Sequence, residues 1–255
     1  MLRLSVLKVE NLRKTYSSEG FLGTRKGKVE ALKGVGFEIG RGEVLALVGE
    51  SGSGKTTAAK IICGLENPDS GLIKWRVSRP HPAQMVFQNP LYSLNPKLSI
   101  KSCLYEALGC AGVPRGKRPA RASELLRGAG LEKINTSKYP HQFSGGQKQR
   151  IAILRALALE PELLVCDEPV SALDISVQAQ VINFLKDINS SAGLPIIFIA
   201  HDLEAVSMIA DRVAVMKEGL IVEEGPAAEV ITSPRNSYTR KLLDSVPVNP
   251  WLSKS

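Results

Sequence analysis

The sequence predicts an α/β fold, in which a mostly parallel sheet is covered by helices on both faces. Short apolar runs of strand length alternate with segments of helical spacing, and parallel neighbours need such crossover connections. The length of 255 residues allows one substantial core, and the 44% share of hydrophobic residues is ordinary for a globular protein. These observations exclude a chain that is mainly disordered.

The first third of the chain predicts strands and one helix. Residues 4–10 and 29–39 alternate as half-buried strands do, and 43–48 is a short buried run that ends in glycine. The polar, basic stretch 17–28 is predicted to be a solvated loop. A helix over 54–65, a break at 67–71 and short strands around Ile73 and at 85–87 follow.

The middle and the end of the chain differ in their patterns. Helical spacing without an intervening strand predicts an all-helical insertion of roughly 60 to 70 residues, with helices at 99–111, 120–129 and 145–159. Strand 163–169, helix 176–189, strand 195–202 and helix 203–210 then restore the alternation. A hairpin over 212–225, with its turn at 217–219, comes last, and no internal repeat is visible.

Charge and cysteine usage limit the cellular setting. The net charge of +8 admits a phosphate-rich or anionic-membrane partner without naming one. No apolar stretch approaches the roughly 18 residues of a membrane span, and the first residues lack a signal-peptide core, so we expect an intracellular chain. The cysteines form no C-x-x-C pair, and we expect them to be reduced and without metal: Cys63, Cys103, Cys110 and Cys166.

A phosphate-binding loop is the strongest motif. Residues 49–56 fit G-x-x-x-x-G-K-[ST], after a predicted strand and at the start of a predicted helix, which is the context that the motif requires. Lys55 would reach the outer phosphates of a nucleotide, and the Thr56 hydroxyl would ligate Mg²⁺. The predicted nucleotide-binding residues here are Gly49, Glu50, Ser51, Gly52, Ser53, Gly54, Lys55, Thr56 and Thr57.

A pair of carboxylates ends the strand that begins at Leu163. Asp167 is suited to hold Mg²⁺ through water, and Glu168 is the candidate that polarises the attacking water. By itself such a pair is more often the surface end of a strand. Its combination with the phosphate loop favours a catalytic role.

Residues 142–150, QFSGGQKQR, together with the carboxylate pair and His201, resemble the nucleotide-binding subunit of ATP-binding cassette (ABC) transporters over nearly the whole chain. The residues similar to that family's signature motif are Ser144, Gly145, Gly146 and Gln147. They form a second anion site at a helix N-terminus. The resemblance implies that this site serves the ATP of a partner subunit.

The resemblance also implies an architecture. We expect a single ABC ATPase domain over 1–255, with a P-loop NTPase core, an antiparallel β-subdomain and an inserted α-helical subdomain. The core and its β-subdomain would comprise 1–90 and 160–233, the helical signature-motif subdomain 91–159, and a C-terminal tail 234–255.

Further site residues are implied by the same resemblance. Tyr16, placed after the first strand, would stack on adenine, unless it is a strand-edge tyrosine. Gln88 would link the metal site to the helical subdomain, unless it is a surface glutamine. His201 would contact the γ-phosphate. Asp174 would form a dimer contact, with helix capping as the competing explanation. The implied catalytic residues are Glu168, His201 and Gln88; the implied metal site is Thr56, Gln88 and Asp167.

Three segments look like the peptide and nickel importer branch: 21–32, 88–96 and the tail 233–247. The tail can equally be an amphipathic helix that closes the domain. Residues 74–84 look shorter than in the family, so part of the β-subdomain would be reduced. The tail lacks the cysteine cluster of some peptide-importer ATPases, and an iron–sulfur tail is not expected. Residues 114–121 are basic. They are interpreted either as a solvated connection or as a contact to anionic lipid headgroups.

The leading hypothesis is an ATPase subunit that couples ATP binding, dimer closure and hydrolysis to uptake of peptides or of nickel and related metal complexes. Its partners would be a second ABC ATPase subunit, the same chain or a related one, transmembrane permeases and, indirectly, an extracytoplasmic solute-binding protein. It would lie at the cytoplasmic face of the membrane, peripherally. The alternative is a soluble mechanochemical ATPase acting on nucleic acid or a cofactor-assembly complex, although no nucleic acid is expected. Intact Lys55, Asp167, Glu168 and His201 argue against a non-catalytic regulatory cassette.

Overall fold

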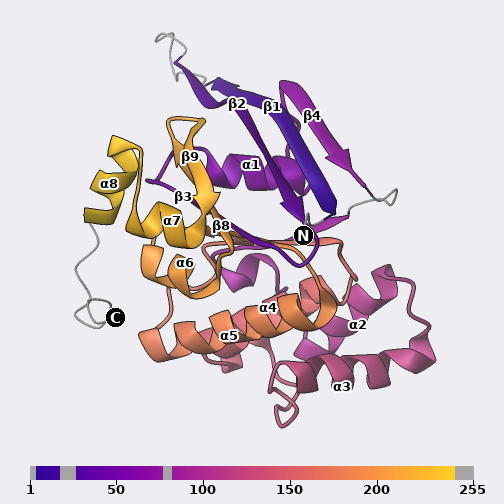
Figure 1. The fold of residues 1–255 in the computed structure, drawn as a ribbon. Coiled ribbons are helices and arrows are strands. Elements are labelled where there is room, and N and C mark those ends of the chain that lie inside the picture. The colour runs from indigo at the N-terminus through magenta and orange to yellow at the C-terminus, as the bar shows by residue number, and fades with distance from the viewer. Residues whose placement is uncertain (1–3, 18–26, 77–81, 245–255) are drawn as a thin grey trace.

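A computed structural model of the chain describes residues 4–17, 27–76 and 82–244, and it contains two sheets (Figure 1). The smaller sheet is antiparallel, in the order β2-β1-β4; the larger has the order β5-β6-β7-β3-β8-β9, and only β9 runs antiparallel to its neighbour. The strands are β1 (Ser5–Ser17), β2 (Lys28–Gly40), β3 (Val44–Val48), β4 (Ser70–Trp75), β5 (Ala83–Val86), β6 (Leu163–Asp167), β7 (Ile196–Ala200), β8 (Arg212–Lys217) and β9 (Leu220–Pro226).

The segment between β5 and β6 is helical, as its spacing predicted, and α4 and α5 pass beneath the larger sheet (Figure 1). The α-helices are α1 (Lys55–Ile62), α2 (Ile100–Cys110), α3 (Arg118–Gly128), α4 (Gly145–Leu157), α5 (Ile175–Ala192), α6 (Leu203–Ile209), α7 (Ala227–Thr232) and α8 (Ser237–Asp244). Three 3₁₀ turns lie at Pro90–Tyr92, Arg115–Lys117 and Pro140–Gln142. The predicted α/β class, with its mixed sheet and helical insertion, is confirmed.

The larger sheet is buried on both faces. Leu45 and Leu47 of β3 face a core shared with α1 and the smaller sheet, while Val44, Ala46 and Val48 face a second core formed with the helices on the other side. All five side chains are at most 2% exposed. Strands that are covered on both faces have continuous apolar sequences instead of alternating apolar and polar residues, which explains the pattern of 43–48.

Strand β1 extends beyond the predicted end at Glu10. Asn11 adopts a left-handed conformation with φ 49°, and the pairing with β2 shifts register between Val9 and Leu12. Such a bulge inserts a residue and interrupts the period-2 pattern that sequence analysis depends on. The placement of Tyr16 after the first strand was therefore wrong, because Tyr16 lies within β1 and pairs with Val29.

Strand order positions the site. Strands β6, β7 and β3 are parallel neighbours, so their carboxyl ends lie along one edge of the sheet. They end at Asp167, Ala200 and Val48, and the phosphate loop, Glu168 and His201 follow directly. Ligands of open α/β sheets bind at this edge.

Several sequence predictions concern segments away from the site. Of the basic stretch 114–121, Arg118 begins α3 and donates from Nε to the Val113 carbonyl at 2.9 Å, and Arg121 pairs with Glu124 at 2.7 Å. Most of the loop 17–28, the middle of the short segment 74–84 and the end of the tail fall outside the described residues. The subdomain boundaries and the proposed headgroup contact remain predictions.

All four cysteines are free thiols, and burial raises the pKa of Cys63 to about 12. Cys166 is fully buried, and burial raises its pKa further. Such thiols stay protonated and unreactive near neutral pH.

None of the helices in the described ranges is both long enough and apolar enough to span a membrane.

Candidate active site

The phosphate loop joins β3 to α1 and packs against β8. A Cβ at Gly49 would collide with the Met216 carbonyl oxygen, so this position requires glycine. Gly54 caps α1 with φ 105°, a left-handed conformation, and within the described residues no side-chain cap accepts from the first N–H groups of the helix. Those N–H groups therefore remain available to an anion, and the helix dipole adds partial positive charge.

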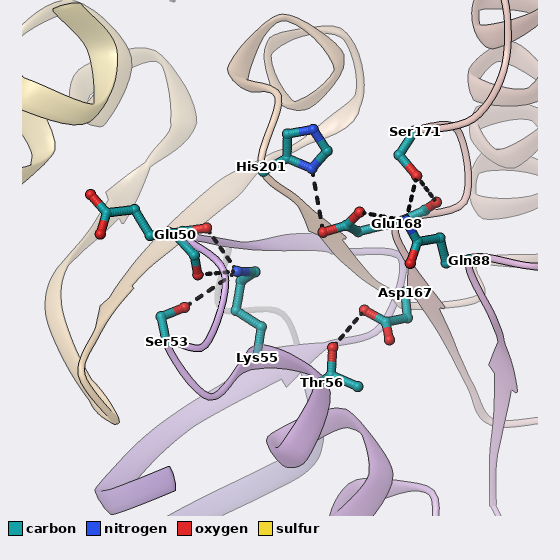
Figure 2. Close-up of polar contacts among 10 residues, drawn as sticks. Glu50, Ser53, Lys55, Thr56, Gln88, Asp167, Glu168, Ser171 and His201 are labelled. Carbon is teal, nitrogen blue, oxygen red and sulfur yellow. Dashed lines mark hydrogen bonds and ion pairs between the residues drawn. The ribbon is translucent and has the colours of Figure 1, made fainter. Parts of the chain in front are cut away.

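Lys55 folds back onto its own loop. Its Nζ donates to the carbonyl oxygens of Gly49 at 2.7 Å and Glu50 at 2.8 Å, and contacts Ser53 Oγ at 3.3 Å (Figure 2). Burial lowers the pKa of Lys55, and the nearby carboxylates of Glu168 and Asp167 oppose this shift. A phosphate group beside the ammonium would stabilise its charged form.

Thr56 and Asp167 provide two oxygen ligands side by side. Thr56 Oγ1 donates to Asp167 Oδ1 at 3.1 Å, from the first turn of α1 to the last residue of β6 (Figure 2). Asp167 is only 7% exposed, and burial raises its pKa, although the bond from Thr56 partly offsets the shift. A buried carboxylate beside a hydroxyl fits Mg²⁺, which prefers oxygen ligands and would offset the cost of burying the charge.

Glu168 lies between two polar side chains from other strand ends (Figure 2). Gln88 Nε2 donates to Glu168 Oε2 at 3.1 Å, and His201 Nδ1 lies 3.3 Å from Oε1. Glu168 itself has a left-handed φ of 46°, held by its N–H bond to the Ile199 carbonyl at 3.0 Å. Strain of this kind is typical of positions that must aim a functional group.

The structure thus divides the predicted catalytic and metal residues into two groups. Gln88 joins Glu168 and His201, whereas Thr56 pairs with Asp167. No cluster of three or more His, Cys, Asp or Glu residues suited to a metal occurs in the described chain. Gln88 as a metal ligand therefore remains a proposal.

Sequence reasoning missed Ser171, which lies three residues after Glu168. Its Oγ is 3.2 Å from Gln88 Nε2 and donates to the Glu168 carbonyl at 3.1 Å. A hydroxyl four residues after a strand end is a local turn signal that could have indicated it. Tyr238 was also missed: its hydroxyl accepts from the Glu50 N–H at 3.1 Å.

The predicted second anion site, at the start of α4, is partly capped by its own side chains. Gln147 N–H donates to Ser144 Oγ at 3.3 Å, and Ser144 N–H donates to Gln147 Oε1 at 3.1 Å, which is a capping box. A Cβ at Gly146 would collide with Val177 of α5, so the glycine lets the two helices approach. Ser144 and Gly145 are exposed.

Two further predicted residues lie at the surface. Asp174 is the N-cap residue of α5 but its side chain makes no capping hydrogen bond, so capping does not explain it. Its neighbour Ile175 is 84% exposed. Tyr16 is 38% exposed, and Lys14 Nζ lies 5.5 Å from the centre of its ring. A dimer contact for Asp174 and adenine stacking for Tyr16 remain proposals.

Comparisons with known proteins identify the family of the chain. The family model described as ABC transporter matches residues 32–171. The oligopeptide transport ATP-binding protein OppD of Mycobacterium bovis is 44% identical over 256 residues, which cover 95% of this chain and 42% of that protein. OppF of Bacillus subtilis is 42% identical over 240 residues, 88% of this chain and 79% of that one. The chain thus spans less than half the length of its mycobacterial relative.

Solved structures show the same fold. The structure of cbiO1 from Clostridium perfringens, part of the ABC transporter complex cbiONQ, superposes with a TM-score of 0.78 at 31% identity, covering 96% of this chain and 97% of that one. An ATP-binding cassette solved as a dimer in a post-hydrolysis state with ADP and Pi gives a TM-score of 0.72 at 29% identity, covering 87% of this chain and 98% of that one. Family model, relatives and fold confirm the resemblance: the chain belongs to the ABC transporter family, as one of its ATP-binding cassettes.

Proposed function

We propose that this chain hydrolyses ATP as a subunit of a peptide importer, lying peripherally at the cytoplasmic face of the membrane beneath its permease subunits. The observation that carries the hydrolytic part is Glu168, held between Gln88 and His201 beside the phosphate loop. Relatives named as peptide transport ATP-binding proteins, such as OppD and the dipeptide protein DppF of Lactococcus lactis, support the choice of solute. None of these names points to nickel, so peptides are the solute proposed.

Nucleotide binding uses the open N-terminus of α1 and one mobile cation. The free N–H groups of the first turn would receive the phosphates, and Lys55 would exchange its loop carbonyls for phosphate oxygens. Thr56 and Asp167 would hold Mg²⁺, which neutralises charge on the phosphates. The Tyr16 ring would stack on the adenine.

Hydrolysis then requires a water aimed at the outer phosphate. Glu168 orients that water and accepts its proton, while His201 and Gln88 hold the carboxylate from its two sides. The His201 side chain is 58% exposed, and it would contact the γ-phosphate. Positioning and charge stabilisation supply most of the catalysis of phosphoryl transfer.

Each site would be completed by a second subunit. Ser144 and Gly145 are exposed, and so are Asp174 and Ile175 at the start of the neighbouring helix α5. In the proposed dimer these surfaces are covered, and Ser144 reaches the ATP held by the partner. Closure on ATP and reopening after hydrolysis would drive the permeases.

The solute can be tested in vesicles that contain the chain, its permeases, the second ATPase subunit and the solute-binding protein. We expect peptide-loaded binding protein to stimulate ATP hydrolysis and peptide uptake. Nickel, supplied in place of peptide, should stimulate neither. A complex that carries Glu168→Gln provides the matched control, since it assembles without turnover. Stimulation by nickel alone would refute the peptide assignment and leave the ATPase assignment intact.

A further inference from the structure

The C-terminal helix α8 reaches the phosphate loop through a single buried tyrosine. Tyr238 is 8% exposed, and its hydroxyl accepts a hydrogen bond from the Glu50 N–H at 3.1 Å. The Lys217 ammonium lies 5.0 Å from the centre of the Tyr238 ring, a cation–π distance that holds the ring in place. The contact joins residues 188 positions apart in the sequence.

The bonded N–H belongs to the peptide unit that also holds Lys55. The Glu50 N–H and the Gly49 carbonyl share one planar peptide, so fixing the direction of one fixes the other. The Gly49 carbonyl accepts from Lys55 Nζ at 2.7 Å. A continuous chain of contacts therefore runs from the Tyr238 hydroxyl through this peptide to the ammonium group.

We propose that Tyr238 is a positioning residue for the phosphate loop, and that the docked helix α8 sets nucleotide affinity through it. The hydroxyl holds the Gly49–Glu50 peptide in one orientation before nucleotide arrives, so that less loop freedom is lost on binding. This inference is independent of the transported solute. It rests on the proposed function only in taking Lys55 as a phosphate ligand.

Helix α8 is held at the site by polar contacts to β9. Glu223 accepts from the N–H groups of Arg235 at 2.7 Å and Asn236 at 3.1 Å. Burial would raise the pKa of Glu223, but the surrounding donors outweigh it and keep the pKa below its usual range. Asn236 accepts from the Tyr238 N–H at 2.8 Å and donates to the Val222 carbonyl at 3.2 Å. Hydrogen bonds from Asn236 and its neighbours thus fix the segment that precedes the helix.

The first test removes only the hydroxyl. Tyr238→Phe keeps the ring and its contact with Lys217, and Tyr105→Phe, in the remote helix α2, is the matched control. We expect Tyr238→Phe to raise the KM for ATP and the Kd for a fluorescent ATP analogue about 3- to 10-fold, the effect of one hydrogen bond. The value of kcat should stay within twofold, because uniform binding is lost and not transition-state stabilisation.

A double-mutant cycle tests whether the effect passes through Lys55. In a Lys55→Ala background, adding Tyr238→Phe should change the Kd less than twofold, because the peptide no longer has an ammonium to hold. Asn236→Ala, which loosens α8 while leaving the hydroxyl, should raise the KM in the same direction. Thermal unfolding without nucleotide verifies that each variant is folded.

The outcomes separate this inference from the proposed function. A Kd and KM for Tyr238→Phe equal to those of Tyr105→Phe would overturn the positioning role, as would tighter binding or an effect undiminished in the Lys55→Ala background. If Lys55→Ala alone binds ATP normally, the assignment of the phosphate site fails instead. A folded Tyr238→Phe variant with weaker ATP binding and an unchanged kcat is the expected result.

Discussion

Two helices of this protein begin at a glycine-rich segment, and their N-termini differ in a way that the motifs do not reveal. Helix α1 begins at Gly54 without a side-chain cap, beside Lys55 and two carboxylates. Helix α4 follows its N-cap residue Ser144, and a capping box with Gln147 satisfies the N–H groups of these two residues internally. The first site presents free donors and a cation, whereas the second presents a hydroxyl at the surface.

This difference indicates which site can hold a nucleotide in the isolated chain. An anion at α1 meets unsatisfied N–H groups, a buried ammonium and an oxygen pair suited to Mg²⁺. An anion at α4 finds the capping box already formed, and both of its polar side chains already paired with backbone N–H groups. The α1 site should therefore bind alone, and the α4 site should act only on a nucleotide that another subunit already holds.

Glu168→Gln should reduce ATP turnover more than any other substitution considered. The amide keeps the shape of the side chain and leaves the phosphate loop intact, but it cannot accept the proton of the attacking water. We expect ATP turnover to fall roughly 100- to 10,000-fold while ATP binding persists and ATP holds subunits together. Steady-state hydrolysis and size-exclusion chromatography with ATP measure this. Near-normal turnover would remove Glu168 from its role.

Lys55→Ala and Ser144→Arg test the comparison directly. Lys55→Ala should weaken ATP binding roughly 10- to 100-fold, since a charge-assisted contact to the phosphates is lost. Ser144→Arg should bind ATP as the unaltered chain does and lose only hydrolysis. Fluorescent ATP binding and turnover are measured on both purified variants. Equal loss of ATP binding in the two variants would mean that α4 contacts the nucleotide within one chain.

Mixing the same two variants tests whether each site is shared between two subunits. In the proposed dimer each closed site would combine Lys55 of one subunit with Ser144 of the other, so the mixed dimer would have one doubly altered site and one intact site. ATPase activity of the mixture should exceed that of either variant alone, provided that the chain pairs with itself. If it pairs with a related ATPase, the two substitutions are divided between the two chains. With dimers verified, activity that stays at the level of the single variants in both arrangements would contradict a shared site.

Asp167→Asn should separate stability from function at the α1 site. Burial raises the pKa of Asp167, so the ionised carboxylate destabilises the folded, ligand-free chain at neutral pH, above the unfolded pKa. Removing the charge should raise the thermal midpoint by about 2–4 °C, the effect of about 1 kcal/mol in a chain of this size, and abolish Mg²⁺-dependent stabilisation by ATP. Exposed Asp187→Asn is the control. A lower midpoint for Asp167→Asn would show that the carboxylate stabilises the empty site.

The smallest effect is expected at Tyr16, which is partly exposed at the end of β1. Stacking on adenine needs the ring and not the hydroxyl, so Tyr16→Phe should change the Kd for ATP less than twofold. Tyr16→Ala should weaken binding up to about fivefold, at the lower end of base–aromatic stacking. Titration with a fluorescent ATP analogue measures both variants. Equal affinities for Tyr16→Ala and the unaltered chain would mean that the ring contributes nothing.

Much of the fold, and the placement of most of the candidate site residues, were predictable because their signals are local. Continuous apolar runs such as 44–48 and 196–200 identify strands buried on both faces, and the alternation of strand and helix implies a parallel sheet. Once the sheet is parallel, the residues after those strands must meet at one edge. Lys55, Asp167 and Glu168 could therefore be placed at this edge before any coordinates, and the resemblance to the family added His201.

The full extent of β1 and the hydrogen-bond partners in the site became known from the tertiary structure alone, because the contacts that fix them join segments far apart in the chain. Continuation of β1 through Asn11 depends on a bulge against β2, which no period-2 pattern shows. The bond from Gln88 to Glu168 spans 80 positions and that from Glu50 to Tyr238 spans 188. From the sequence come the groups that the protein carries and most of the elements on which they lie, since periodicity and motif spacing are local. Which backbone donor a distant hydroxyl satisfies is determined by packing of whole elements.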